Sequence, residues 1–234
     1  MTGTTHRFFV APESIQGDRF PVPASIEHQV QRVLRLGPGA ELVLLDGSGS
    51  ELLCTIESAG DLRVIDRREA SGEPGHRLTI WQALLKGDGL DRVIQQGTEL
   101  GIVSFRPIVT RRCVVRELSP RRVERLRTIA REAAEQSERG VIPSVEPPVP
   151  LTAALHAPAV LLFERMHSDG QRLGELAAPS ELIIGPEGGF DADEIAEAER
   201  AGVTLAGLGP RILRAESVAI AATAVVLAHA GDFA

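Results

Sequence analysis

The spacing of apolar and polar positions changes part-way along the chain. The first third carries short apolar or alternating runs bounded by turn residues, which are typical of β-strands. These runs are 8–10, 41–45 and 51–56. The Asp-Gly-Ser-Gly sequence at 46–49 predicts a hairpin turn between the last two. One helix is predicted over 26–36, with Ile26, Val30, Val33 and Leu34 on one stripe. The pattern predicts a small β-barrel-like domain.

After the Ser-Gly-Glu-Pro-Gly stretch at 71–75, strand-like and helix-like runs alternate. We therefore predict two domains, residues 1–72 and 73–234. The strands expected in the second are 78–85, 102–110, 141–146, 159–163, 181–184 and 203–208. The helices expected there are 90–100, a long helix starting at 120, 191–201 and 217–230. Such alternation predicts an α/β domain with a mostly parallel sheet covered by helices.

The long helix after Ser119-Pro120 separates apolar from charged positions. Its apolar face is predicted to be Val123, Leu126, Ile129, Ala130 and Ala133, with Arg121, Arg125, Arg127 and Arg131 pointing away from it. Downstream, Asp191 and Glu194 have the spacing of a capping box and predict where the next helix begins.

Two Gly- and Pro-rich turns close the last third of the chain. They are Leu-Ile-Ile-Gly-Pro-Glu-Gly-Gly-Phe at 182–190 and Leu-Gly-Pro-Arg-Ile-Leu-Arg-Ala-Glu-Ser at 208–217. Each follows a strand-like run and opens into a helix-like run, so each is expected at the carboxyl edge of the sheet, where open α/β folds bind ligands. The two turns therefore predict a binding site.

The sequence narrows the ligand by exclusion. A phosphate-binding P-loop needs a Lys after its last Gly, and the only lysine of the chain, Lys86, is not near either turn in sequence. A dinucleotide fingerprint is also absent, because Arg92 occupies the place of the third Gly after Gly87 and Gly89. The Gly- and Pro-rich turns can still offer backbone N–H and C=O groups to a flat, mostly uncharged heterocycle. This fits an adenosine-like cofactor without a triphosphate.

Composition supports a globular protein in a reducing compartment. Hydrophobic residues make up 43% of the 234 residues, enough for a sizeable core. Cys54 and Cys113 have neither the spacing of a zinc site nor that of a disulfide framework, so we expect no metal and a cytoplasmic location. The first residues lack the apolar core of a signal peptide, and no apolar run approaches the roughly 20 residues of a membrane span.

The net charge of −7 conceals a strongly basic segment. Residues 106–131 contain nine Arg against two Glu, a balance of +7, which leaves −14 on the rest of the chain. Arginines on one solvated helix face are the simpler interpretation, but Arg111, Arg112 and Arg116 lie before the predicted helix. Because the planar guanidinium suits phosphates and base edges, a polyanion partner is favoured.

The two closing turns resemble the signature loops of the SPOUT superfamily of RNA methyltransferases, and most closely the RsmE-like family. Further matches to that family's pattern cover nearly the whole chain. They are Arg7-Phe8-Phe9, His28 with Val33-Leu34-Arg35, the Asp46-Gly47 turn, Thr98-Glu99-Leu100-Gly101 and Glu135-Gln136-Ser137. Two positions depart from it: Gln96 replaces an expected Lys, and Ala215 replaces the usual Thr of the last loop.

The resemblance implies a fold, a reaction and partners. It implies a PUA-like β-barrel that helps to hold RNA, followed by an α/β domain whose end forms a trefoil knot. It also implies a homodimer that uses S-adenosylmethionine to methylate N3 of a uridine in small-subunit (16S) ribosomal RNA, on free RNA or on an assembling subunit. The apolar run at 218–230 agrees with a dimer interface and equally with plain core.

Candidate site residues follow from the turns and the resemblance together. Those expected to hold the cofactor are Phe163, Ile184, Gly185, Pro186, Glu187, Gly188, Gly189, Leu208, Gly209, Pro210, Ile212, Leu213 and Ser217. Those expected to hold RNA are Arg7, His28, Arg32, Arg35, Arg111, Arg112, Arg116 and Gln136.

The catalytic candidates are Arg211, Arg214 and Glu216. Either arginine could stabilise a uracil anion, grip a phosphate, or form a salt bridge to Glu187 or Glu216. Glu216 could accept a proton or favour the start of the last helix, and Glu187, Glu216 and water all stay open as the general base. Two other functions compete: a non-catalytic RNA-binding module of ribosome assembly, and a different nucleotide-using α/β enzyme.

Overall fold

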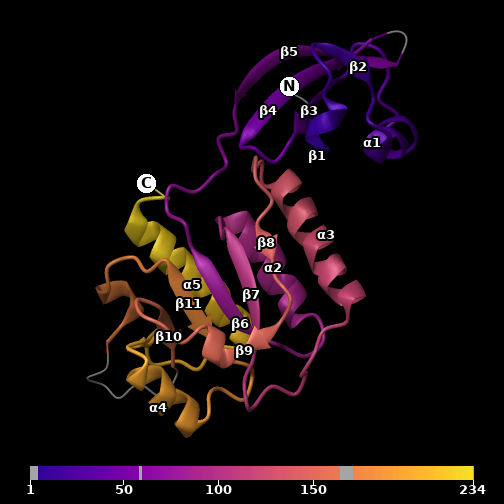
Figure 1. Ribbon diagram of the computed structural model, residues 1–234. Coiled ribbons are helices and arrows are strands. Elements are labelled where there is room, and N and C mark those ends of the chain that lie inside the picture. Colours follow the sequence, from indigo (N-terminus) through magenta and orange to yellow (C-terminus); the bar gives the residue numbers. More distant parts are fainter. Residues whose placement is uncertain (1–4, 58–59, 164–170, 234) are drawn as a thin grey trace. The chain divides into compact units, whose positions relative to one another are not determined.

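The computed structural model describes residues 5–57, 60–163 and 171–233. Its elements fall into two compact units, coloured along the sequence in Figure 1. Unit 1 contains Met1–Glu73 and Ala134–Ile142, and unit 2 contains Pro74–Ala133 and Pro143–Ala234. The predicted division after residue 72 lies next to the boundary at Glu73. The sequence pattern does not indicate that the later segment Ala134–Ile142 belongs to the first unit.

Unit 1 is built on one five-stranded sheet. Its strand order is β1 (His6–Phe9), β3 (Glu41–Leu45), β4 (Ser50–Ile56), β5 (Asp61–Glu69) and β2 (Arg19–Pro21). β1 pairs with β3 in parallel, and the other neighbours are antiparallel. The predicted strands at 8–10, 41–45 and 51–56 and the hairpin between the last two are confirmed. β2 and β5 were not predicted individually, because most side chains of β5 are exposed and polar.

The helical segment of unit 1 is shorter than predicted. α1 spans Ala24–His28 and continues into a π-helical turn, Gln29–Val33. Ile26 and Val30 are buried in the core of the unit as expected, but the side chain of Val33 is 62% exposed and does not belong to the stripe. The backbone leaves the helix at Arg35, whose φ is +52°. A positive φ cannot continue a right-handed helix, so the prediction of a helix to residue 36 was wrong.

Unit 2 contains a seven-stranded sheet in which every described pair is parallel. Its main strand order is β12 (Thr204–Ala206), β10 (Val160–Leu162), β11 (Glu181–Ile184), β6 (Thr79–Ala83), β7 (Ser104–Val109) and β8 (Ser144–Val145), with β9 (Val149–Pro150) also paired to β7. The expectation of a mostly parallel sheet is confirmed, although the run at 141–146 forms only the two residues of β8.

Four longer helices accompany this sheet (Figure 1). They are α2 (Gly89–Leu100), α3 (Pro120–Gln136), α4 (Ala192–Arg200) and α5 (Ala215–Ala230). The described residues also form short 3-10 turns at Leu151–Ala153 and Leu173–Glu175 in unit 2 and at Pro12–Ser14 in unit 1. α2 packs against α5, and its Gly97 lies against Phe105 of β7. A side chain on Gly97 would meet Ile102 at 2.5 Å and Phe105 at 2.9 Å, so only glycine permits this close approach.

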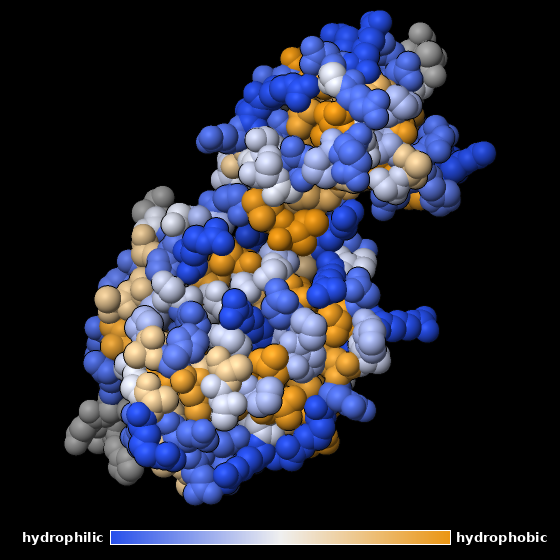
Figure 2. All heavy atoms as spheres, in the orientation of Figure 1, coloured by the Kyte–Doolittle hydropathy of each residue, from blue (hydrophilic) through white to orange (hydrophobic). Residues whose placement is uncertain are grey.

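The local signals of these helices are confirmed. α4 begins with a capping box, because the carboxylate of Asp191 accepts from the backbone of Asp193 and that of Glu194 accepts from the backbone of Asp191. In α3, the predicted apolar positions are buried or half-buried and the four outward arginines are exposed. Hydrophilic side chains cover most of the drawn face of each unit in Figure 2, with apolar groups between them. Among the described helices, none has the length and apolar character needed to span a bilayer.

Candidate functional site

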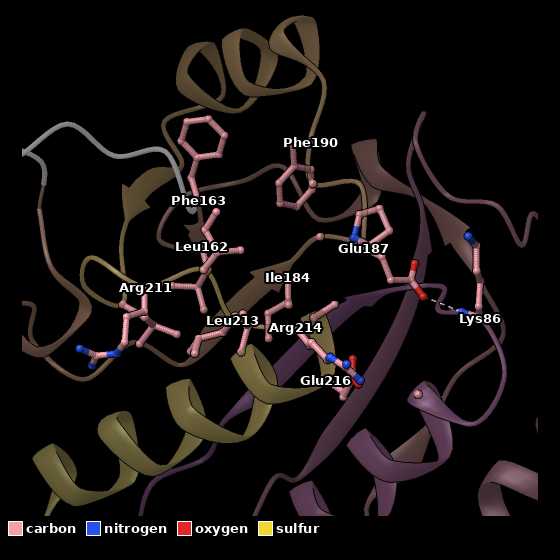
Figure 3. A pocket seen from close by; sticks show the side chains of 18 of the residues that line it. Lys86, Leu162, Phe163, Ile184, Glu187, Phe190, Arg211, Leu213, Arg214 and Glu216 are labelled. Carbon is pink, nitrogen blue, oxygen red and sulfur yellow. Dashed lines mark hydrogen bonds between the residues drawn. The ribbon is translucent and has the colours of Figure 1, made fainter.

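The carboxyl ends of four neighbouring parallel strands surround one pocket of about 540 Å³. These strands are β12, β10, β11 and β6, and the segments that follow them supply the walls (Figure 3). The edge where parallel strands end is the usual ligand site of open α/β folds, and the volume is typical of a pocket for a small molecule. The two Gly- and Pro-rich turns, which are separated in sequence by residues 191–207, therefore meet at one site as expected.

Most of the predicted cofactor-binding residues line this pocket. They are Phe163, Ile184, Gly185, Pro186, Glu187, Gly189, Leu208, Gly209, Ile212 and Leu213, and the catalytic candidates Arg211, Arg214 and Glu216 line it as well. Gly188, Pro210 and Ser217 are not among the lining residues. The lining also includes residues that the sequence analysis did not select: Lys86, Asp88, Gly89, Leu162, Phe190, Ala215 and Val218.

The loop after β11 favours glycine at two positions, at Gly189 for its backbone conformation and at Gly185 for lack of space. Gly189 has a φ of +66°, and its N–H donates to the carbonyl of Pro186 at 2.9 Å, which closes the turn. A side chain on Gly185 would approach the ring of Phe190 to 3.0 Å. A side chain on Gly188 would instead meet Cβ of Arg112 at 3.3 Å. Gly188 therefore contributes by letting a neighbouring segment pack against the loop.

This loop is anchored from two other parts of unit 2. The backbone N–H of Lys86, after β6, donates to the Glu187 carboxylate at 2.9 Å. The buried Glu194 carboxylate accepts from the backbone N–H of Arg111 at 2.7 Å and from that of Asp191 at 2.8 Å. These contacts fix the backbone at the pocket before any ligand arrives.

The loop after β12 carries the charged candidates of the site. Gly209 has a φ of +103° with open space around it, Leu208 and Leu213 are half-buried, and Ile212 is 84% exposed. Arg211 and Arg214 are exposed. Within the described part of the chain neither arginine forms an ion pair, so the alternative of salt bridges to Glu187 or Glu216 is not what the structure has.

Lys86 is the functional candidate that sequence reasoning missed. It is distant from both turns along the chain, and we excluded a nearby lysine on that ground. The structure corrects this inference, because β6 lies beside β11 and its carboxyl end brings Lys86 to the pocket wall. The sequence signal was available in principle: Lys86 directly follows an apolar run that was predicted to be a strand, and so was expected at the same edge of the sheet.

The residues expected to hold RNA have different surroundings. His28, Arg32, Arg35 and Gln136 are exposed in unit 1. Arg7 is not: its side chain is only 10% exposed and is ion-paired to Glu51 and Glu138. An arginine neutralised in this way is held by its own unit, so we leave Arg7 out of the RNA surface.

The three arginines after β7 are engaged within unit 2. Arg111 is ion-paired to Asp191 at 3.0 Å and also to Asp193. Arg112 donates to the carbonyl of Gly188, and Arg116 donates to the carbonyls of Thr110 and Arg111. All three remain exposed at the surface. The contacts of Arg111 and Arg112 support the loop at 185–190, which we call the cofactor loop, and the start of α4, whereas those of Arg116 stay within its own segment.

No cluster of three or more His, Cys, Asp or Glu suited to a metal ion occurs in residues 5–57, 60–163 and 171–233. Both cysteines are free and buried. Burial raises the pKa of the Cys54 thiol to about 11, against a smaller opposing effect of Arg67. A thiol with so high a pKa is neutral and inert at physiological pH.

Two protein-family models match this chain, one within unit 1 and the other mainly within unit 2. The model of the RNA methyltransferase domain covers residues 72–227, and that of the RNA methyltransferase PUA domain covers residues 30–65. The chain belongs to this RNA methyltransferase family. It is 33% identical to ribosomal RNA small subunit methyltransferase E of Synechocystis, over 94% of this chain and 77% of the relative, and 31% identical to that of Bacillus subtilis, over 88% and 89%.

Solved structures of the family have the same fold. Ribosomal RNA small subunit methyltransferase E from Neisseria gonorrhoeae, bound to S-adenosyl methionine, matches with a TM-score of 0.85 and 28% identity, over 96% of this chain and 98% of that one. A methyltransferase from Legionella pneumophila in complex with the same cofactor matches with a TM-score of 0.83, 28% identity and the same coverage. The expected fold class, a SPOUT α/β domain with a PUA-like N-terminal domain, is thereby confirmed.

Proposed function

We propose that this protein is an S-adenosylmethionine-dependent methyltransferase that modifies N3 of a uridine in small-subunit ribosomal RNA. The observation that carries the proposal is the meeting of the two closing turns at one pocket, at the carboxyl ends of β11 and β12. The substrate is supported by relatives that are named ribosomal RNA small subunit methyltransferase E. The similarity covers most of their length and most of this chain.

The residues of the pocket fit the proposed cofactor. Leu162 and Leu213 lie at one end of the pocket in Figure 3, beside the loop after β12. Phe163 and Leu208 also line the pocket, and these apolar residues suit an adenine ring. Lys86, Glu187, Arg214 and Glu216 lie toward the other end of the pocket, where the amino-acid portion of the cofactor needs polar partners. Arg211 lies at the apolar end. When bound, S-adenosylmethionine supplies an electrophilic methyl group on its sulfonium.

The residues of this chain then have to orient the acceptor and remove its proton. Arg214 and Glu216 lie close together at the start of α5 in Figure 3, and both line the pocket. We assign Arg214 to the uracil oxygen that gains negative charge as N3 loses its proton, which an unpaired guanidinium stabilises. We favour Glu216 over Glu187 as the group that takes this proton, because the Glu187 carboxylate already accepts from the Lys86 backbone.

RNA would be held by both units. The exposed His28, Arg32, Arg35 and Gln136 of unit 1 provide donors for phosphates and sugars. In unit 2 the exposed guanidinium groups of Arg111, Arg112 and Arg116 add positive charge next to the cofactor loop. A low aromatic content of 3%, with no Tyr, favours such electrostatic contacts over base stacking.

We further propose a homodimer that pairs through α5. This helix is apolar around its whole circumference, yet Val218, Ile220, Ala221, Ala224 and Val225 are only partly buried within one chain. A second copy would cover this apolar row. Analytical ultracentrifugation tests the pairing. We expect the wild type to sediment as a dimer and Ile220→Glu to sediment as a monomer. Action on ribosomal RNA would place the protein in the cytoplasm, and no metal is needed for methyl transfer.

Mapping of methylated uridines tests the function itself. Small-subunit RNA from cells with and without the protein should differ at one uridine, and the purified protein should restore the mark from labelled S-adenosylmethionine. Binding of RNA without methyl transfer would favour the non-catalytic assembly module. A different nucleotide found by mass spectrometry in the purified protein would favour the other α/β enzyme.

A further inference from the structure

We propose that Lys86 binds a phosphate of the substrate RNA at the end of the pocket opposite the adenine site. This inference rests on the proposed function and extends it to a residue outside both closing turns. Lys86 is exposed and lines the pocket from the turn between β6 and α2. Figure 3 shows it at one end of the lining residues and Arg211 at the other, with Arg214 and Glu216 between them.

Two of the three carboxylates that line the pocket have partners, whereas its cations have none among the described residues. Asp88 pairs with Arg92 at 2.9 Å, and Glu187 accepts from the backbone N–H of Lys86. Among the described residues, no hydrogen bond or ion pair involves the ammonium group of Lys86 or the guanidinium groups of Arg211 and Arg214. Three cationic side chains thus line the pocket, and Glu216 is the one lining carboxylate left without a partner among the described residues.

The cofactor cannot satisfy all three cations. S-adenosylmethionine has one carboxylate, and its sulfonium and ammonium groups are themselves positive. The cofactor carboxylate and that of Glu216 can together balance two of the three cations, so at least one cation is left for a second, anionic ligand. A nucleic acid presents one phosphate per nucleotide, so an RNA strand that places a uracil at Arg214 and Glu216 also brings flanking phosphates to the mouth of the pocket.

Lys86 is the cation best placed for a flanking phosphate. Arg211 and Arg214 lie on the loop after β12, which also forms the adenine end, while Lys86 lies on a separate wall beyond Glu187 and Glu216. Its backbone is fixed by the hydrogen bond to Glu187, so its position is tied to the cofactor loop. A flexible ammonium group is a common phosphate ligand because it needs no particular approach direction.

The test compares Lys86→Gln with Lys86→Arg and with a matched loss of charge elsewhere. Arg77→Gln is the control, because Arg77 is exposed just before the opposite end of β6. Three quantities are measured for each protein: the Kd for a small-subunit ribosomal RNA transcript at several salt concentrations, the Kd for S-adenosylmethionine by calorimetry, and the KM for the RNA. Folding is checked by circular dichroism.

Lys86→Gln should raise the Kd and the KM for RNA about three- to tenfold and reduce the slope of log Kd against log salt by about 0.7. Lys86→Arg and Arg77→Gln should resemble the wild type, and the Kd for S-adenosylmethionine should stay within twofold throughout. Unchanged RNA affinity in Lys86→Gln, or an equal loss in Arg77→Gln, would overturn the inference. Weaker cofactor binding with normal RNA binding would overturn it too, and would assign Lys86 to the cofactor carboxylate. A wild type that neither binds nor methylates RNA would instead refute the proposed function.

Discussion

Arg112 donates a hydrogen bond of 3.0 Å from its guanidinium Nη1 to the carbonyl oxygen of Gly188. The segment after β7 thereby holds the loop after β11, and the neighbouring Arg111 reinforces the contact through Glu194 and Asp191. Two arginines that composition alone assigns to RNA are thus part of the support of the cofactor loop.

Arg112→Gln should therefore weaken cofactor binding. The loss of one charge-assisted hydrogen bond at a half-exposed site is worth about 1 kcal/mol, so the Kd for S-adenosylmethionine should rise about three- to tenfold by calorimetry. Arg121→Gln, an exposed position on α3, is the control and should leave the cofactor Kd unchanged. If Arg112→Gln weakens only RNA binding and flattens its salt dependence, the guanidinium acts on RNA and not on the loop.

Gly189→Ala should also impair cofactor binding, through strain. A residue with a side chain at a φ of +66° costs about 1 to 2 kcal/mol, and the loop can relieve this strain by leaving its present conformation. We expect the Kd for S-adenosylmethionine to rise about tenfold. Gly231→Ala, with a φ of +90° at the end of α5 and open space around it, imposes comparable strain away from the pocket. It should lower thermal stability without changing the cofactor Kd, and equal cofactor losses in both variants would contradict the role of Gly189.

Glu216→Gln should affect the chemical step more than binding. Removal of a general base typically costs 10² to 10⁴ in rate, so we expect kcat to fall at least about 100-fold while the Kd for S-adenosylmethionine changes little. The pH profile of the residual activity decides the assignment. If Glu216 only stabilises the start of α5, the variant will lose stability and keep the wild-type profile.

Glu51 should make unit 1 sensitive to acid. Burial by itself raises the pKa of Glu51, but hydrogen bonds and charges from Arg7 and Arg68 outweigh it and hold the pKa below its ordinary value. A depressed pKa in the folded state means that the stabilisation is present at neutral pH and is lost as the pH falls through that pKa. Glu51→Gln should lower the free energy of unfolding by about 3 kcal/mol at pH 7, and its difference from the wild type should shrink below about pH 4.

Hydrogen exchange of residues 41–56 is the appropriate measurement, because Trp81, the only tryptophan, lies in unit 2 and its fluorescence does not report on unit 1. Glu69→Gln, on an exposed residue of β5, is the control and should change stability by less than about 0.5 kcal/mol. A difference between Glu51→Gln and the wild type that stays constant down to pH 3 would contradict the depressed pKa.

Most strands of the sheet in unit 2 were predictable because they are buried runs with turn residues at both ends, whereas the two-residue β9, which is not buried, was not predicted. Glu181–Ile184 and Val160–Leu162 are such buried runs, and the capping box of Asp191 and Glu194 set the start of α4. β5 lacks this signal, since most of its side chains face solvent and its stability comes from pairing with β4. The end of the helical segment near Arg35 depends on one positive φ that apolar periodicity does not encode.

The candidate site was predictable as far as it lies in contiguous sequence. The two turns can be recognised in the sequence by their Gly and Pro content and by their position after predicted strands. Lys86 and Arg112 reach the same place through strand order, because β6 neighbours β11, and the segment after β7 packs on the loop after β11. Strand order is a long-range property of the fold, and one sequence read by local pattern does not supply it.

A crystal structure of the protein grown with S-adenosylmethionine tests the central claim most directly. The account predicts density for the cofactor in the pocket between Gly185–Gly189 and Leu208–Leu213, with its adenine beside Leu208 and Leu213 and its methyl group directed toward Arg214 and Glu216. Cofactor bound at another place, or a pocket that stays empty at saturating cofactor while the protein is folded, would contradict it.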